Sequence, residues 1–305
     1  MAVFHFATPF LLVRGSGKYC LSPFTRKGCC TCSLKAGRLT GRSTGPIAAV
    51  RHSGYKSLAQ MPAHHNGPVS YDVRHHMTSI FAGSGPGIQT PDGCSVDLYR
   101  ALPYMGEIDD IEPALRRHSS VLELGCGNGR ICKRMADLGL QVTGVDESPE
   151  MLAHLPPGIE GVLSSIEGLS LGRRWPAVIL PSHLVNHPAD AVRNAFIAAA
   201  RRHTSNAGTF FVKRHDPTWL ATVQAGPIGK SHGVSYFAEH VTRSGNQVTM
   251  TLRYEVSGQS WTQSFSTTSL SEMEVEDQLR QHGFGQLEWF GPKRLWASAS
   301  AGDAS

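Results

Sequence analysis

The fold of this chain is decided by residues 119–152, which read SSVLELGCGNGRICKRMADLGLQVTGVDESPEML. Val121–Leu124 is a short run with β propensity, and a glycine-rich loop follows it at residues 125–129. A helix is predicted over 130–138, because apolar residues recur there with the spacing of one helix face. The first half of the stretch therefore predicts a strand, a glycine loop and a helix, in that order.

The second half predicts a return to the sheet. A second strand is expected over 141–145, and it ends in Asp146. Ser148 and Pro149 are typical of an N-cap and a first helical position, so another short helix carrying Met151 should follow. The whole stretch is thus a β–α–β unit with its glycine loop at the start of the helix.

Such a unit is suited to a cofactor that carries a nucleoside. Glycines in the loop let the backbone approach a ligand closely. Asp146 lies about 20 residues beyond Gly125, where a carboxylate at the end of the second strand accepts hydrogen bonds from a ribose diol.

Two residues argue against a dinucleotide as that cofactor. Arg130 stands where the pattern G-x-G-x-x-G has its third glycine, and Glu123 precedes Gly125 by two residues. A carboxylate near the loop repels a pyrophosphate but attracts a cofactor with a cationic ammonium and sulfonium. A nicotinamide-dependent dehydrogenase is therefore a weaker interpretation.

The segment Glu123–Gly129, with the sequence ELGCGNG, closely resembles motif I of the class I S-adenosylmethionine-dependent methyltransferases. Residues 142–151 resemble the segment that follows this motif, and the resemblance extends roughly over residues 105–300. It implies S-adenosyl-L-methionine as the cofactor. The residues that it assigns to cofactor binding are Glu123, Gly125, Cys126, Gly127, Asn128, Gly129, Asp146, Glu147, Met151, Ser165, Ile166 and Pro181.

The resemblance also implies an α/β fold, with a Rossmann-like sheet of seven mostly parallel strands, helices on both faces and an antiparallel last strand. Ser165 takes the place of an acid that often touches the adenine amino group in this family. The elements expected in the rest of the chain are strands over 160–164, 177–181 and 209–213, a helix over 188–203, a helix from the capping box Ser271–Glu274 to about residue 281, and a closing β pair over 284–290 and 294–299.

Residues 233–268 lie outside this common core. Three alternating runs, at 234–242, 248–256 and 261–267, are separated by turns that contain glycine. This pattern predicts a three-stranded antiparallel meander inserted after the fifth strand. Two roles remain open for it, namely covering the substrate or extending the sheet.

Two loops carry candidate catalytic residues, because ligands of open α/β sheets bind at the carboxyl ends of the strands. His183 follows the fourth expected strand, and His215 follows the fifth. A histidine can remove a proton from the methyl acceptor near neutral pH, and His215 is the first candidate. Asp216 is instead expected to cap a turn at Pro217. Whether a base is needed stays open, since some acceptors are already nucleophilic. Candidates for a lid are Tyr71, His75 and His76.

Charge divides the chain into two parts. Residues 1–70 contain nine Lys or Arg and no Asp or Glu, so the rest of the chain carries 20 basic and 24 acidic residues, a net charge of −4. We interpret 1–70 as a disordered basic N-terminal extension and 71–305 as one methyltransferase domain. Three roles for the extension remain open: organellar targeting through residues 1–60, binding of a polyanion, or no folded role.

The remaining composition predicts a cytoplasmic protein with no metal and no membrane segment. Four of the seven cysteines lie in the extension, and no second pair completes a metal site with Cys29, Cys30 and Cys32. An odd number of cysteines without a recognisable framework is expected to stay reduced. No apolar stretch approaches the ~20 residues that cross a bilayer.

The sequence thus predicts an S-adenosylmethionine-dependent methyltransferase that acts on an oxygen, nitrogen or carbon nucleophile of a small molecule. The alternative is a nucleic-acid methyltransferase, with RNA held by the basic extension. The negative charge of residues 71–305 disfavours nucleic acid, as do the missing Asn/Asp-Pro-Pro-aromatic loop and the missing Pro-Cys dipeptide. A third interpretation is a non-catalytic module that only binds the cofactor. The sequence identifies neither the acceptor nor the oligomeric state.

Overall fold

The computed structural model describes residues 81–302. The expected basic extension over 1–70 and its cysteine cluster lie outside the described residues, as do the candidate lid residues Tyr71, His75 and His76. Within 81–302, no helix is both long enough and apolar enough to cross a membrane.

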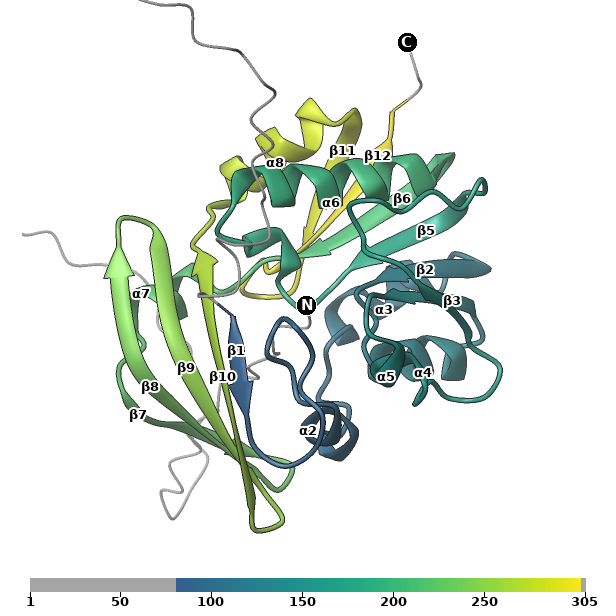
Figure 1. Cartoon of the computed structure of the whole chain (residues 1–305). Coiled ribbons are helices and arrows are strands. Elements are labelled where there is room, and N and C mark those ends of the chain that lie inside the picture. Colours follow the sequence, from purple (N-terminus) through teal and green to yellow (C-terminus); the bar gives the residue numbers. More distant parts are fainter. Residues whose placement is uncertain (1–80, 303–305) are drawn as a thin grey trace, which may run out of the picture. The chain divides into compact units, whose positions relative to one another are not determined.

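A seven-stranded sheet forms the centre of the described fold (Figure 1). In spatial order its strands are β11 (Phe284–Phe290), β12 (Trp296–Ala301), β6 (Thr204–Lys213), β5 (Trp175–Leu180), β2 (Ser120–Leu124), β3 (Gln141–Asp146) and β4 (Glu160–Leu163). β12 pairs antiparallel with both of its neighbours, and the other neighbouring pairs are parallel. The predicted sheet of seven mostly parallel strands with an antiparallel last strand is confirmed.

Three details of this sheet differ from the sequence prediction. β6 begins at Thr204 rather than at 209, because α6 passes into it without a loop. β12 begins at Trp296 rather than at 294, since a turn with φ +50° at Arg294 precedes it. β5 begins at Trp175 rather than at 177, and its register with β6 shifts beside Pro176, which has no backbone N–H to donate to the ladder.

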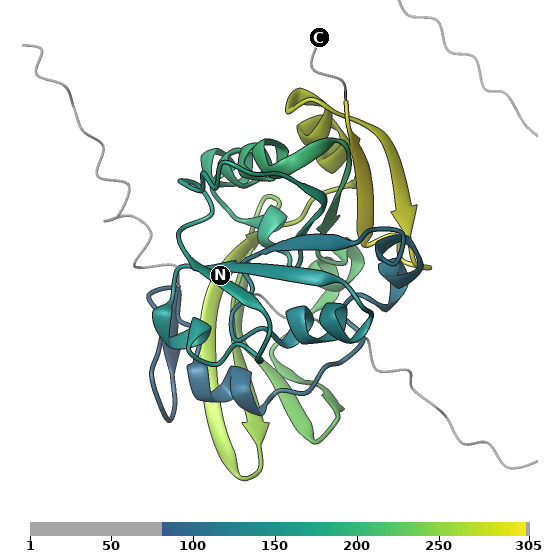
Figure 2. The same ribbon diagram turned by 90° about the vertical axis from the view of Figure 1, so that its right-hand side faces the viewer.

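Helices cover both faces of the sheet, and Figure 2 shows the parallel strands lying between them. The helices and 3-10 turns are α2 (Val96–Ala101), η1 (Asp109–Ile111), α3 (Glu112–Leu115), α4 (Arg130–Asp137), α5 (Pro149–Leu152), η2 (Leu184–Asn186), α6 (Asp190–His203), α7 (Pro217–Thr222) and α8 (Glu272–Gln281). α6 and α8 pack on one face, and α3 and α4 pack on the other.

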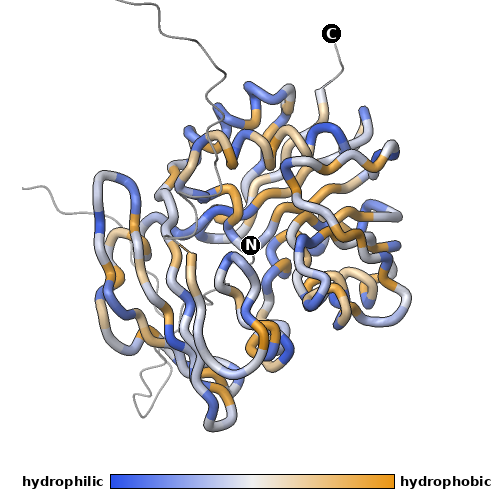
Figure 3. The backbone as a smooth tube through the Cα atoms, in the orientation of Figure 1, coloured by the Kyte–Doolittle hydropathy of each residue, from blue (hydrophilic) through white to orange (hydrophobic). Residues whose placement is uncertain are grey.

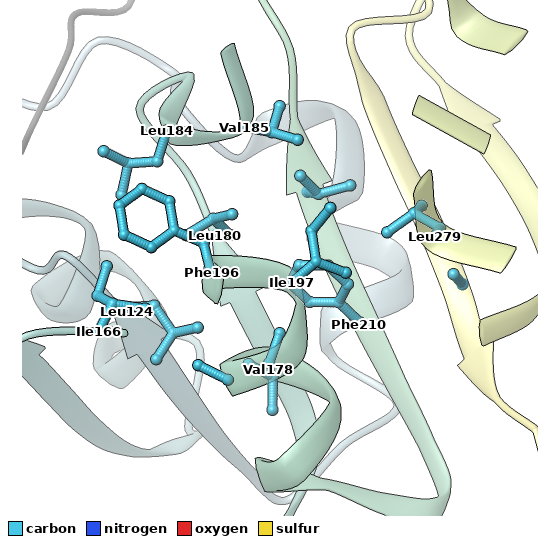
Figure 4. Packing of buried hydrophobic residues seen from close by; sticks show 14 of the residues in the cluster. Leu124, Ile166, Val178, Leu180, Leu184, Val185, Phe196, Ile197, Phe210 and Leu279 are labelled. Carbon is cyan, nitrogen blue, oxygen red and sulfur yellow. The ribbon is translucent and has the colours of Figure 1, made fainter. Parts of the chain in front are cut away.

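Strand alternation explains how the sheet has two apolar faces. Successive side chains of a strand point to opposite sides, so Val121 of β2 joins the α4 layer while Leu122 joins the α6 layer. Figure 4 shows the α6 layer, where Phe196 packs among strand residues and Leu279 approaches from α8. Burial on both faces is typical of a parallel sheet.

The helix starts follow the capping signals in the sequence. Ser148 caps α5, and its side chain accepts the Met151 N–H. The predicted capping box of α8 is present, because Ser271 and Glu274 each accept from the backbone N–H of the other. These contacts satisfy N–H groups that a helix start otherwise leaves without partners.

The three strands of the predicted antiparallel meander are confirmed, and two further strands extend it to a separate antiparallel sheet of five strands. Its order is β1 (Ala82–Ser84), β10 (Gln259–Thr268), β9 (Gln247–Val256), β8 (Val234–Ser244) and β7 (Gly226–Ser231). The sequence missed β7 because glycine and proline weaken its strand signal. It missed β1 because three residues are too few to show alternation. We call this element the second sheet.

The second sheet has one polar face and one apolar face. Burial alternates along β9, and Figure 3 shows polar and apolar segments following one another along these strands. The apolar face packs on residues of α2 and α7 and on Met151 of α5. The second sheet therefore packs on the side of the fold that carries α2, α5 and α7.

Candidate active site

The glycine loop between β2 and α4 is tied to the end of β3. The backbone N–H groups of Gly125 and Cys126 both donate to the carbonyl oxygen of Val145, at 2.9 Å each. The Gly127 N–H donates to Oδ2 of Asp146 at 2.7 Å. The loop and the predicted ribose-binding acid are therefore held as one unit.

Asp146 links three elements of the site. Its Oδ2 accepts from the glycine loop, and its Oδ1 accepts from the Ser148 N–H at 3.0 Å, next to the start of α5. The residue is buried, with 5% of its surface exposed. A carboxylate has about four acceptor sites, so two sites remain for hydroxyl groups of a ligand.

A small pocket lies beside this unit. Its lining residues are Thr90, Asp92, Cys94, Gly127, Asp146, Glu147, Ser148 and Met151. Four of the residues that the family resemblance assigns to the cofactor thus line one pocket. The opposite wall is the segment Thr90–Cys94, which the sequence analysis missed, although its Thr-Pro-Asp-Gly sequence is a turn signal.

The glycines of the loop differ in what they face. A Cβ atom built on Gly127 would have Tyr99 Cδ1 as its nearest neighbour, at 4.0 Å, so this position opens toward free space in the pocket. A Cβ on Gly129 would lie 2.6 Å from Leu155 Cδ2, so packing requires that glycine. Asn128 lies between them and is half-buried.

The structure corrects the argument from Glu123. This residue lies inside β2 with 1% of its surface exposed, and the Cys132 thiol of α4 donates to its Oε2 at 2.9 Å. Burial raises the pKa of Glu123 to about 8, so it is mainly protonated at pH 7. It does not line the pocket, and it does not supply the negative charge beside the loop that the sequence analysis expected.

Three further predicted cofactor residues lie at the same edge of the sheet but outside the pocket lining. Ser165 is exposed after β4, and Pro181 is buried after β5. Ile166 is buried in the α6 layer, where Figure 4 shows it beside Leu124. Their contact with a cofactor stays a prediction.

The two candidate catalytic histidines are brought together. The His183 and His215 rings stack with their centroids 3.8 Å apart and their planes at 18°. Ser182 and His183 have φ +60° and +61°, a left-handed conformation that is uncommon for side-chain-bearing residues and often marks functional sites. Trp219 of α7 lies next to this pair, with its ring centroid 6.1 Å from that of His215. Sequence spacing alone did not reveal this stack.

Burial controls the protonation of this cluster. Burial, together with a smaller effect of the nearby Lys213, lowers the pKa of His215 to about 3. His215 is therefore neutral at pH 7, and its buried Nε2 has no hydrogen-bond partner among the residues that the structure describes. Burial also lowers the pKa of Lys213 to about 7.

The expected role of Asp216 as a cap is confirmed. Its side chain accepts the backbone N–H groups of Thr218 and Trp219 at the start of α7, at 2.9 and 3.2 Å. Its other oxygen accepts from Lys293 at 2.8 Å. Asp216 therefore positions the start of α7.

Comparison with known proteins agrees with this geometry. The family model described as a methyltransferase domain matches residues 121–208. The ubiquinone biosynthesis O-methyltransferase of Bartonella quintana is 32% identical over 108 residues, which are 33% of this chain and 43% of that protein. A dTDP-3-amino-3,6-dideoxy-alpha-D-glucopyranose N,N-dimethyltransferase of Streptomyces fradiae is 27% identical over 169 residues, 51% of this chain and 65% of that protein. The chain thus spans less than two thirds of either relative.

Solved structures share the fold. A sugar N-methyltransferase from Streptoalloteichus superposes with a TM-score of 0.55 at 16% identity, over 82% of this chain and 100% of that chain. An amino pentose methyltransferase from Micromonospora echinaspora, solved with S-adenosylmethionine bound, superposes with a TM-score of 0.54 at 20% identity, over 67% of this chain and 95% of that chain. The family match therefore shows a methyltransferase domain over residues 121–208, and the superpositions show that the chain adopts the methyltransferase fold.

Proposed function

We propose that this chain transfers a methyl group from S-adenosylmethionine to an oxygen, nitrogen or carbon nucleophile of a small molecule. The observation that carries the proposal is the placement of two groups at one edge of the sheet. The pocket with Gly127 and Asp146 lies at the carboxyl ends of β2 and β3, and the histidine stack follows β5 and β6. Ligands of open α/β sheets bind at this edge.

The residues of the pocket fit the cofactor. The open space at Gly127 admits a ligand, and Asp146 keeps acceptor sites for a ribose diol. Asp92 and Glu147 add two more acids to the lining. Clustered carboxylates favour a cationic ligand over a pyrophosphate. These acids, rather than Glu123, therefore support S-adenosylmethionine over a dinucleotide as the cofactor. When bound, S-adenosylmethionine supplies a methyl group that its sulfonium activates.

The histidine stack is suited to orienting the nucleophile. The unpartnered Nε2 of His215 can accept a hydrogen bond from an N–H or O–H of the acceptor. With a pKa of about 3, His215 does not retain a proton at pH 7, so we assign it an orienting role and transient proton acceptance. The proton that the acceptor loses then passes on to water. His183 supports the ring by stacking on it.

Among small molecules we propose an amino sugar attached to a nucleotide as the first acceptor to test. The relative from Streptomyces fradiae, whose name describes methylation of such an amine, gives the longer of the two matches reported above. A neutral amine needs only orientation by a neutral histidine, which agrees with the depressed pKa of His215. An oxygen nucleophile is the second acceptor to test, after the O-methyltransferase from Bartonella quintana. We further propose a reducing, cytoplasmic setting, since Cys126 and Cys132 form no disulfide within the part of the chain that the structure describes.

The experiment uses the full chain and methyl-labelled S-adenosylmethionine. Acceptors are a dTDP-3-amino sugar, a catechol, a small-metabolite extract and an RNA transcript. We expect label in a small molecule, with one equivalent of S-adenosylhomocysteine formed for each methyl group transferred. Transfer to RNA alone would move the function to nucleic-acid methylation. Binding of NAD in place of S-adenosylmethionine in calorimetry would overturn the assignment.

A further inference from the structure

One buried side chain joins the two histidine loops to the second sheet. Asn186, at the end of η2, is 1% exposed and makes hydrogen bonds with all four of its polar groups. In the side chain, Oδ1 accepts from the His215 N–H at 2.8 Å, and Nδ2 donates to the Thr268 carbonyl at 2.7 Å. In the backbone, the Asn186 N–H donates to the His183 carbonyl at 2.8 Å, and the Asn186 carbonyl accepts from Thr267 Oγ1 at 3.2 Å.

We propose that Asn186 is a positioning residue that holds His215 against His183 and ties both to the end of β10. This inference rests on the proposed function, because it assigns Asn186 its role through His215. The side chain of Asn186 uses its acceptor and one donor on backbone groups of two different segments. It acts on the acceptor only by fixing the histidine that faces it.

The chemistry of the carboxamide explains why this residue type is suited to the position. One planar group must accept from an N–H in the loop after β6 and donate to a carbonyl at the end of β10. Aspartate can accept but cannot donate when it is ionised, and leucine of similar size can do neither. Loss of the carboxamide would leave the buried His215 N–H and Thr268 carbonyl without partners, which carries a desolvation penalty.

The strained turn before η2 also depends on Asn186. Ser182 and His183 both have positive φ, a conformation that persists only where the surroundings hold it. The Asn186 N–H closes this turn on the His183 carbonyl. Asn186 thereby fixes the backbone of one histidine through its own N–H and the backbone of the other through its side chain.

The first measurement needs no acceptor. The full chain is labelled with ¹⁵N-histidine, and the imidazole signals of His215 are followed from pH 5 to pH 8 in wild type, Asn186→Leu, Asn186→Asp and Thr267→Val. In wild type His215 should stay neutral throughout this range. In Asn186→Leu, water should reach the His215 ring, and the ring should titrate between pH 5 and pH 8. Thr267→Val is the matched control, since it removes one bond of the same junction but leaves the carboxamide in place, and it should match wild type.

The second measurement is the methyl-transfer rate with the best acceptor found above, in wild-type and His215→Ala backgrounds. We expect Asn186→Leu to lower kcat by ~10–100-fold with an unchanged KM for S-adenosylmethionine, and to add no further loss to His215→Ala. If Asn186→Leu does not fold, Asn186→Asp is measured in the same two backgrounds. Unchanged His215 signals, or an equal loss of kcat in both backgrounds, would overturn the proposal. Absence of turnover in the wild-type chain counts against the proposed function alone, because the histidine signals still decide the role of Asn186.

Discussion

At the scale of single residues, Asp146 is the acid on which cofactor affinity should depend most. Asp146→Ala removes the acceptor for ribose hydroxyls and also releases the Gly127 N–H. We expect a loss of about 1.5–3 kcal/mol in the binding free energy of S-adenosylmethionine, measured by calorimetry. Asp137→Ala is the control, because Asp137 forms an exposed ion pair with Lys133 on α4, and this variant should bind the cofactor as wild type does. Equal affinity of both variants would remove Asp146 from the site.

The histidine stack should control turnover rather than cofactor binding. We expect His215→Ala to lower kcat by ~10²–10⁴-fold with little change in cofactor affinity, and His183→Ala to lower it less. The control is His232→Ala, at an exposed turn of the second sheet. Wild-type kinetics in the double variant of His183 and His215 would leave alignment by other groups as the mechanism.

The burial of Glu123 should make the stability of the folded chain depend on pH. Its pKa is raised to about 8 in the folded chain, so between pH 4.5 and 8 the folded state binds more protons than the unfolded state. The stability that Glu123 contributes is present below this window and is lost as pH rises through it, by at most about 1.4 kcal/mol per pH unit. Glu123→Gln should therefore gain in Tm relative to wild type between pH 5.5 and pH 8.5. The exposed Glu288→Gln should show no such gain.

At the scale of elements, the glycine loop combines a backbone requirement with a steric one. Gly127 has φ +55° and faces the pocket, whereas Gly158 has φ +85° and no atom within 4 Å of a built Cβ. Alanine at either position should cost stability of about 1–2 kcal/mol, because both backbones are left-handed. Only Gly127→Ala should also weaken S-adenosylmethionine binding. The comparison of Tm with calorimetric affinity separates the two effects, and equal affinity losses would contradict it.

The second sheet shows where element prediction depends on context. β8, β9 and β10 have long alternating patterns, and the sequence predicts all three. β1 and β7 are the first and last strands in the order of this sheet, and each pairs with one strand among residues 81–302. A short edge strand is stabilised by the partner that it finds in the folded chain, so its own residues carry little signal.

At the scale of the whole molecule, the charge asymmetry leads to a test of the N-terminal extension. Residues 1–60 are basic and lack a sustained apolar period, so removing them should leave the folded domain intact. A chain that begins at Met61 should keep the Tm and the S-adenosylmethionine affinity of the full chain. A Tm lower by many degrees would mean that the extension contributes to the folded domain.

What the sequence by itself determined is the β–α–β unit and the helix caps, whereas the seven-stranded sheet was implied by the family resemblance. The unit and the caps depend on local chemistry. Gly127 and Gly129 adopt backbone angles that favour glycine, Ser148 and Ser271 satisfy nearby N–H groups, and the apolar periods report which faces are buried. Each of these signals lies within a few residues of the structure that it predicts.

Only the tertiary structure decided the chemistry of the site. The sequence places Glu123 in a strand before the loop, but its raised pKa depends on how completely the fold removes it from water. The pocket wall at Cys94 is held by Gln263, 169 positions along the chain, and Asn186 meets Thr268 across 82 positions. The stack of His183 on His215 likewise arises because two parallel strands end at the same edge. Contacts between distant segments leave no local pattern, so the catalytic geometry follows from packing and not from the order of residues alone.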